Sequence, residues 1–473
     1  MRNVKLSLST TVLVTLAAYS ALDDDGPRFL NNLPWIFLAA WLAILNVVID
    51  RRWYAKHVFK PSAILLIYIS TSFLLGAFAY RYDLVLDVAN RHSLYFFKTI
   101  GYITSYVLLA FAMLLLVWRL QFRMASNINA EETIHDSPNH KKPTSVRRGR
   151  ILLSILILLL CAAIEIVQPS PHLIDPAALF LFSALYLSRR AQTDAPRFRI
   201  YLYLCLSIVL AAVFYDDRRL VALFLFTLLF MEWGPQAKVS ITFAGMAKII
   251  AATGALITLV IAMSMVRGVG EFGVSTLYSA LERIPDYLMM EQRLAVFLHN
   301  FEVAPTLFHT YDAIRYVSET GDFLYGKTIL KFLFLAVPRE IFESKPDSVV
   351  HLYTSALYPN FRTVGGSWVP NILAEGYWNF GYAGGLIYLV ILIAILDRVY
   401  IKQFHRLLLP NALDGVLFLS CYLYLIFLFR GSGLDLFAYY CILSFISYWV
   451  YRGIFWSTTV GRGLDNGSAR SRA

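Results

Sequence analysis

The sequence predicts an all-α membrane protein with many spans. Of its 473 residues, 58% are hydrophobic and only 15% are charged, which is far from the composition of a soluble domain. Apolar runs of nearly twenty residues recur along the chain, the length at which a helix crosses a hydrocarbon core of about 30 Å. Because backbone polar groups must be satisfied within the membrane, these runs are expected to form a helical bundle.

About twelve apolar segments are expected to cross the membrane. Each is bounded by polar, charged or turn-forming residues, and several are short for a full crossing. In chain order they are Leu6–Leu22, Leu33–Ile49, Ser62–Ala79, Thr99–Val117, Ile151–Gln168, Ala177–Leu187, Ile200–Tyr215, Leu220–Trp233, Ala244–Val266, Gly384–Leu396, Gly415–Phe429 and Leu434–Tyr451.

The spacing of these spans divides the chain into six parts. The longest interruption of the hydrophobic pattern precedes the last three spans, so that chemistry is expected in that interruption or facing it. The parts are N-terminal spans (1–118), a basic cytoplasmic linker (119–150), central spans (151–266), a large external loop with short helices (267–383), C-terminal spans (384–451) and a cytoplasmic tail (452–473).

Lysine and arginine gather in alternate loops, as the positive-inside rule describes. Arg51 and Arg52 lie in one such loop, and Arg147 and Arg148 lie in the next loop on the same side. The alternation predicts that both termini are cytoplasmic and that residues 267–383 lie outside. The formal net charge of +11 is therefore a topology signal, and no nucleic-acid partner is expected.

Six basic residues break this rule, because they lie at external ends of spans or in the external loop. An ionisable residue placed against the topological bias is a functional candidate. Converging arginines suit a multiply charged anion, whose oxygens a guanidinium group binds in a bidentate fork. The alternative is that each reaches a lipid headgroup or pairs with a neighbour such as Asp217. The six are Arg218, Arg219, Arg267, Arg339, Lys345 and Arg430.

A polar stripe leads into the span that begins near Gly384. Asn371, Glu375, Asn379 and Tyr382 recur at intervals of four, four and three residues, which places them on one helical face. We expect Glu375 to belong to a site; the alternative is a glutamate in solvent. The same segment is rich in aromatic residues of the kind found on sugar-binding or interfacial surfaces, namely Tyr377, Trp378 and Phe380.

Three histidines, His299, His309 and His351, also lie in the external loop. Histidine serves as a general base near neutral pH, but spacing alone favours none of the three. No cysteine pair indicates a metal or redox site. No glycine-rich nucleotide motif is present either, so that a nucleotide-dependent enzyme is not indicated.

Five short motifs of the C-terminal half form a pattern, namely Tyr325-Gly326-Lys327, Pro338-Arg339, Lys345-Pro346, the run from Glu375 to Gly381, and Arg430-Gly431. Together they resemble the Wzy-type polysaccharide repeat-unit polymerases. The resemblance covers the chain from about Asp216 onward. It departs from the family where Glu340–Ser344 separates the two proline motifs, since the family often has a hydroxyl residue and a tryptophan-proline pair there.

The resemblance implies a glycosyltransferase with a GT-C-like helical bundle in the inner (cytoplasmic) membrane of a bacterium, with its active site facing the periplasm. The implied donor and acceptor are both oligosaccharides on a polyprenyl diphosphate. The growing chain leaves its lipid diphosphate and joins the non-reducing end of a new lipid-linked repeat. Membrane lipid and a chain-length regulator protein are the other implied partners.

The same resemblance gives the candidate residues their roles. Positive charge is needed where the diphosphate leaves, and the arginines and Lys345 named above are the expected diphosphate ligands. On this basis no metal or other cofactor is expected. The acceptor hydroxyl needs a base, for which Glu375 and His299 are the candidates. The expected sugar-binding residues are Asn371, Tyr377, Trp378, Asn379 and Tyr382.

Two other functions compete with this one. An O-antigen ligase uses the same type of donor with a lipid A core acceptor, and it also has about twelve spans and an external loop with arginines. A flippase or transporter of the lipid-linked sugar predicts charges deep inside several spans and broken helices in paired positions. Glu165 and Lys248 are the few charges of that kind in the expected spans.

Overall fold

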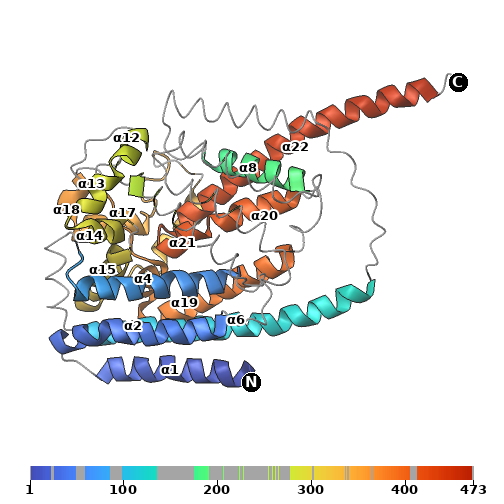
Figure 1. The fold of residues 1–473 in the computed structure, drawn as a ribbon. Helices are drawn as coiled ribbons and strands as arrows, with labels where there is room; N and C mark the ends of the chain where they lie inside the picture. Colours follow the sequence, from blue (N-terminus) through green and yellow to red (C-terminus); the bar gives the residue numbers. More distant parts are fainter. Residues whose placement is uncertain are drawn as a thin grey trace. The chain divides into compact units, whose positions relative to one another are not determined.

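The computed structural model shows a chain built from α-helices (Figure 1). No described residue lies in a strand, so the all-α expectation is confirmed for this part of the chain. The described residues are 2–22, 26–48, 59–85, 99–135, 175–190, 277–300, 303–335, 337, 340–363, 366–404 and 413–470, with the single positions 206, 223, 227, 254, 258, 261, 262 and 265.

The helices fall into long apolar ones and a series of short ones between them. In chain order they are α1 (Arg2–Leu22), α2 (Gly26–Val48), α4 (Pro61–Arg81), α6 (Ile100–His135), α8 (Asp175–Arg190), α12 (Leu277–Glu282), α13 (Ile284–Met289), α14 (Arg293–Asn300), α15 (Val303–Thr320), α16 (Lys327–Leu330), the 3₁₀ turn η2 (Lys331–Phe334), α17 (Val349–Leu357), α18 (Pro359–Thr363), α19 (Ile372–Phe404), α20 (Leu413–Leu423), α21 (Leu425–Arg430) and α22 (Leu434–Arg470).

Six helices of the described residues are long and apolar enough to cross a membrane. They lie on α1, α2, α4, α6, α19 and α22, where six of the expected spans were placed. The expected span Ala177–Leu187 falls on α8, which has 16 residues, and Gly415–Phe429 is divided between α20 and α21. Apart from single positions, the other four lie outside the described residues: Ile151–Gln168, Ile200–Tyr215, Leu220–Trp233 and Ala244–Val266.

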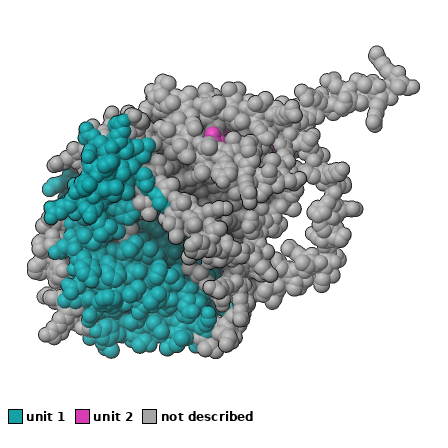
Figure 2. Space-filling view, in the orientation of Figure 1, with its two compact units in different colours: residues 1–136, 233–402, 425–437 teal, residues 137–232, 403–424, 438–473 magenta. Residues whose placement is uncertain are grey.

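The chain divides into two compact units (Figure 2). Unit 1 comprises residues 1–136, 233–402 and 425–437, and unit 2 comprises residues 137–232, 403–424 and 438–473. All candidate site residues that the structure describes lie in unit 1. In unit 2, Phe180 and Ala184 of α8 pack against Val416 of α20 and Tyr448 of α22.

The core of unit 1 is built on four N-terminal helices that lie side by side, α1, α2, α4 and α6 (Figure 1). Phe73 of α4 shows how they meet, because its fully buried ring contacts one aromatic ring from each neighbouring element. The ring centroids of Phe37 on α2, Phe111 on α6 and Tyr311 on α15 lie 5.3, 6.3 and 6.2 Å away. The helix α15 thus packs onto the N-terminal helices.

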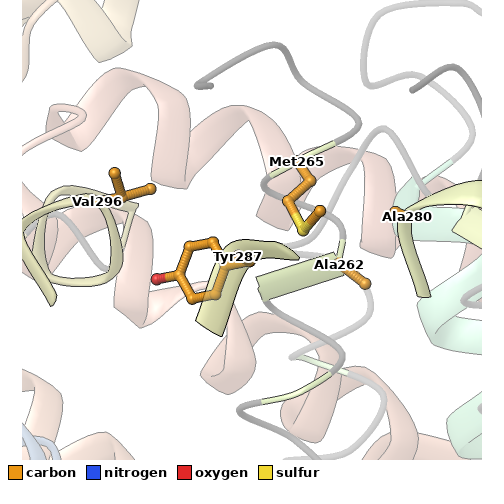
Figure 3. Close-up of a cluster of buried hydrophobic side chains, with 5 residues drawn as sticks. All are labelled: Ala262, Met265, Ala280, Tyr287 and Val296. Carbon is orange, nitrogen blue, oxygen red and sulfur yellow. The ribbon is translucent and has the colours of Figure 1, made fainter. Parts of the chain in front are cut away.

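Short helices make up the first part of the segment expected to be an external loop. Tyr287 of α13 lies among Ala262, Met265, Ala280 and Val296, which form a small apolar cluster (Figure 3). Its hydroxyl donates a hydrogen bond of 2.6 Å to a backbone carbonyl of α14. These contacts hold the short helices α12, α13 and α14 together.

The helix α19 consists of two halves that meet at a sharp turn. Gly381 has a φ of +69° and a ψ of −166°, which no helical residue adopts. In a straight helix, Gly376 and Gly385 would lie about 13.5 Å apart at 1.5 Å per residue. A Cβ on Gly385 would instead lie 2.9 Å from the carbonyl carbon of Gly376. Residues 372–380 therefore fold back against the beginning of residues 382–404.

The second half of α19 is anchored to α4 by a buried carboxylate. Asp397 is fully buried, and it accepts hydrogen bonds from the backbone nitrogen (2.9 Å) and the hydroxyl (2.6 Å) of Ser62. Lys60, also buried, adds a favourable charge interaction with Asp397. Both oxygens of Asp397 are thus satisfied at the first turn of α4, where a negative charge also suits the helix dipole.

The close approach of the two halves of α19 predicts an unusual sign for a glycine-to-alanine change. Alanine in a helix is normally more stable than glycine by about 0.5–1 kcal/mol. Gly385→Ala should instead destabilise the fold by about 1–3 kcal/mol, because the new methyl group meets backbone atoms that cannot move aside. The thermal unfolding midpoint of the purified protein measures the effect. Gly453→Ala in α22 is the matched control, since a Cβ there meets nothing within 4 Å. An equal response of both variants would contradict the close packing.

Candidate functional site

Glu375 lies in the interior of unit 1, in the half of α19 formed by residues 372–380. Its side chain is completely buried, so the alternative of a glutamate in solvent is wrong. Thr328 of α16 donates its hydroxyl hydrogen to Oε1 of Glu375 at 3.1 Å. The same Thr328 hydroxyl oxygen accepts a hydrogen bond of 2.8 Å from Nδ2 of Asn379. This Nδ2 also donates to the backbone carbonyl of Glu375 at 2.9 Å. Thr328 therefore joins the two polar residues of the stripe.

The position of Thr328 depends on a turn that the sequence encodes locally. Gly326 directly precedes α16 and has a φ of +84°. This left-handed backbone conformation favours glycine. The turn packs against Phe380, whose ring atoms would lie 3.5 Å from a Cβ on Gly326. The motif Tyr325-Gly326-Lys327 thus places α16 against the half-helix that carries Glu375.

A buried ion pair lies close to this group. Lys331 of η2 pairs with Asp435 in the first turn of α22. Asp435 is 6% exposed, and it is near enough to Glu375 for the two carboxyl groups to interact electrostatically. Asp435 therefore has Lys331 as its ion-pair partner and Glu375 as a neighbouring carboxyl group. Sequence reasoning missed Thr328, Lys331 and Asp435; the available signal was a carboxylate at the beginning of an apolar span, just after Arg430-Gly431.

Several buried polar atoms of this group have no hydrogen-bond partner among the described residues. Three are acceptors and one is an amide donor, so that a ligand with hydroxyl groups matches both kinds. An unpaired buried polar group costs about 1–3 kcal/mol, which is a reason to expect a ligand or water there. The atoms are Oε2 of Glu375, Oδ1 of Asn379, Oδ1 of Asp435 and Nδ2 of Asn371.

Asn371 also has a structural role, because it caps the helix. Its Oδ1 accepts hydrogen bonds from the backbone nitrogens of Leu373 (2.9 Å) and Ala374 (3.1 Å), the arrangement that satisfies the first amides of a helix. Asn371, Glu375 and Asn379 are all fully buried, as expected for residues on one helical face.

Tyr382 does not continue this face, because the helix breaks at Gly381 before reaching it. Its hydroxyl lies 2.9 Å from the hydroxyl of Ser105 on α6, and its ring centroid lies 5.1 Å from that of Tyr102 and 5.2 Å from that of Tyr106. The expectation of one stripe with four members is therefore wrong at its last position. The reason is the backbone break, which residue spacing does not reveal.

The aromatic candidates Tyr377 and Trp378 are buried in the packing of unit 1, with exposed fractions of 3% and 2%. The hydroxyl of Tyr377 lies 3.2 Å from that of Tyr102 and 2.9 Å from that of Ser318. Trp378 donates from its indole nitrogen to the carbonyl of Asp322 at 3.0 Å. Tyr102 and Tyr106 complete this tyrosine cluster and were not singled out from the sequence.

Arg430 ends α21, and the following turn is pressed against the beginning of α19. Gly431 has a φ of +93°, and a Cβ on it would lie 1.5 Å from the carbonyl oxygen of Pro370. This contact places the residue after Arg430 next to the helix start that carries Asn371 and Glu375. A cation at a helix C-terminus also stabilises that helix.

Lys345 contacts the backbone that follows η2. Its Nζ donates hydrogen bonds to the carbonyl oxygens of Leu335 (3.4 Å) and Val337 (2.9 Å). The other expected diphosphate ligands, Arg218, Arg219, Arg267 and Arg339, lie outside the described residues.

His299, the second candidate base, lies apart from the Glu375 group in the contacts it makes. Its ring centroid lies 6.1 Å from that of Trp368, and it lines a small cavity together with His309. In the part of the chain that the structure describes, no three histidine, cysteine, aspartate or glutamate side chains form a metal-binding group.

Comparisons with protein-family models, with curated proteins and with solved structures found no match to this chain.

The Thr328 hydroxyl predicts a specific pattern of stability. Thr328→Val keeps the shape of the side chain but leaves Oε1 of Glu375 and Nδ2 of Asn379 without this bond, and should destabilise the fold by about 1–3 kcal/mol. Thr328→Ser keeps the hydroxyl and should lose much less. The thermal unfolding midpoints of the two variants check this. Equal losses would show that the methyl group, and not the hydrogen bonds, matters at this position.

Proposed function

We propose that the chain is a polymerase that joins polyprenyl-diphosphate-linked oligosaccharide repeat units on the periplasmic face of a bacterial inner membrane. The observation that carries the proposal is the buried Glu375, which has an unpaired carboxylate oxygen and lies among Asn371, Asn379 and Asp435. The contact of Gly431 with Pro370 supports it, because Arg430 is held beside the same helix start.

The proposed reaction is a glycosyl transfer without a metal. A hydroxyl oxygen at the non-reducing end of the acceptor forms a bond to the anomeric carbon of the donor sugar. The bond from that carbon to the diphosphate oxygen breaks, and its electron pair leaves with the lipid diphosphate. Glu375 takes the hydroxyl proton, and the cationic side chains stabilise the charge on the leaving group.

Contacts made by the motifs that resemble the Wzy-type polymerases also support the proposal. Tyr325-Gly326-Lys327 positions Thr328 against Glu375. The run from Glu375 to Gly381 forms the half-helix and its terminal break. Lys345 holds the carbonyls that precede Pro338-Arg339. Two motifs far apart in the sequence, at Gly326 and at Glu375, thus contribute to one polar group in unit 1.

Among the described residues, the buried charge of Asp397 does not favour a transporter. Asp397 lies deep in the second half of α19, but Ser62 satisfies both of its oxygens. A residue that binds and releases cargo needs free coordination positions. Glu375 and its neighbours are among the residues that do have unpaired atoms, and Glu165 and Lys248 lie outside the described residues.

The test is the chain length of the polysaccharide made in cells that lack the native gene and carry a variant. Glu375→Gln keeps the size of the side chain but removes the base, and should reduce polymerisation by about 10²–10⁴-fold, with single lipid-linked repeats accumulating. Glu343→Gln is the matched control, because Glu343 is an exposed glutamate of the same external segment. Normal chain length in Glu375→Gln would contradict the proposal.

Purified protein in lipid vesicles separates the competing functions. Given only lipid-linked repeats, a polymerase extends them, whereas a ligase needs lipid A core and leaves them unchanged. A flippase moves them between leaflets and forms no new glycosidic bond. Extension in the wild type and its loss in Glu375→Gln are the expected results.

A further inference from the structure

A second polar group in unit 1 is centred on His309 of α15. The ring is 2% exposed, and its Nδ1 lies 2.8 Å from the hydroxyl oxygen of Tyr353 on α17. The Tyr353 hydroxyl donates in turn to Oδ2 of Asp312 at 3.3 Å. His309 and Asp312 lie three residues apart and therefore share one face of α15. A chain of hydrogen bonds runs from a buried carboxylate through a tyrosine to an imidazole.

The carboxylate at the end of this chain is held firmly. Arg315 donates to Oδ1 of Asp312 at 2.8 Å and forms an ion pair with it. Tyr358 donates to Oδ2 at 2.7 Å. Asp312 is thus a charged and well-oriented acceptor, which makes hydrogen bonds to it stronger than those to a neutral group.

The single proton of Tyr353 determines which nitrogen of His309 carries hydrogen. Burial and the neighbouring Asp312 carboxylate raise the pKa of Tyr353, so the hydroxyl keeps its proton. Donation to the charged Asp312 is favoured over donation to a neutral imidazole. It also avoids two oxygen atoms facing each other with no hydrogen between them. The oxygen of Tyr353 therefore accepts a hydrogen bond from Nδ1–H of His309.

This assignment leaves Nε2 of His309 as an acceptor. Burial lowers the pKa of His309 to about 3, and the nearby His299 adds to the effect, so the ring is neutral and carries one hydrogen. That hydrogen is on Nδ1, and Nε2 keeps its lone pair. The hydrogen bond that His309 makes with Tyr353 uses Nδ1, which leaves Nε2 as the ring atom that can accept from a ligand.

A cavity of about 20 Å³ lies beside this histidine. Its lining includes Trp368 and His299 as well as Tyr80 and Phe308, so its walls are largely aromatic. A volume of this size holds one water molecule or one hydroxyl group. A hydroxyl donates to an acceptor such as Nε2, and the carbon that carries it suits aromatic walls.

We infer that this cavity is a subsite for one hydroxyl group of a sugar, which donates its hydrogen to Nε2 of His309. The inference rests on the proposed function for the identity of the ligand as a sugar. His309 is then a binding residue that selects the position of one hydroxyl, and Tyr353 and Asp312 are positioning residues that set its tautomer. Glu375 remains the base.

Nitrogen NMR of the protein with ¹⁵N-labelled histidine tests the tautomer directly. The protein is placed in nanodiscs of phosphatidylcholine, whose headgroup has no hydroxyl, so that lipid cannot imitate the sugar. His309→Gln identifies the two resonances of this ring. In the wild type, Nδ1 should resonate as a protonated nitrogen and Nε2 as an unprotonated one. A protonated Nε2 would overturn the inference. This measurement needs only the wild type and the His309→Gln variant used for assignment.

Two tyrosine variants separate the positioning role from general packing. Tyr353→Phe keeps the ring but breaks the chain, and should move the hydrogen toward Nε2. Tyr358→Phe is the comparison variant, because it removes a bond to the same oxygen of Asp312 and the Tyr358 contact with Tyr353, but it keeps the Tyr353 hydroxyl that links Asp312 to His309. The control should keep the wild-type tautomer. The same response in both variants would contradict the role of Tyr353.

Addition of free sugars tests the ligand. Galactose, mannose and N-acetylglucosamine are the probes, and at least one should shift the Nε2 resonance toward the hydrogen-bonded position in the wild type and in Tyr358→Phe, but not in Tyr353→Phe. No shift with any of them would mean that the cavity holds water only and would overturn the subsite. Glu375→Gln should keep the sugar-induced shift while losing polymerisation, so that failure of the subsite and failure of the proposed function are distinguishable.

Discussion

The close packing of two half-helices at Gly376 and Gly385 is the constraint on which the polar interior of unit 1 depends. Because neither residue has a Cβ, residues 372–380 can lie directly against the helix that follows Gly381. This arrangement turns Glu375 and Asn379 inward, where Thr328 binds both. A straight helix would carry the same side chains along one axis, and α16 would have no place beside them.

Unit 1 contains two polar centres of different chemical character. At Glu375 and its neighbours, several buried atoms lack partners among the described residues, and Lys331 pairs with Asp435. At Asp312, the carboxylate is fully engaged by Arg315, Tyr353 and Tyr358, and only the far end of the chain, at His309, is open. The first suits a reaction that moves a proton, and the second suits fixed recognition of one hydroxyl. Tyr353 and Trp378, with ring centroids 6.3 Å apart, join the packing around the two centres.

Residue spacing correctly predicted several parts of this arrangement. Of the roughly twelve spans expected from apolar runs, six fall on helices long and apolar enough to cross a membrane. The interval of four residues placed Asn371, Glu375 and Asn379 on one face, which the structure shows to be buried. It could not predict Tyr382, because Gly381 breaks the helix before that residue. Residue spacing also could not show that Tyr377 and Trp378 are buried. An aromatic residue on one face of a helix gives the same sequence pattern in a core and on a sugar-binding surface.

The sequence by itself determined the helical, membrane-type character of the chain, because hydrophobic length and charge alternation are properties of neighbouring residues. It also marked Glu375 and Arg430 as unusual. Only the tertiary structure decided what they face. Thr328, Lys331 and Asp435 come from separate elements, and the chain from Asp312 to His309 requires Tyr353 of another helix. Hydrogen bonds of this kind depend on distances between distant segments, which are set by packing and by glycine contacts that no local pattern encodes.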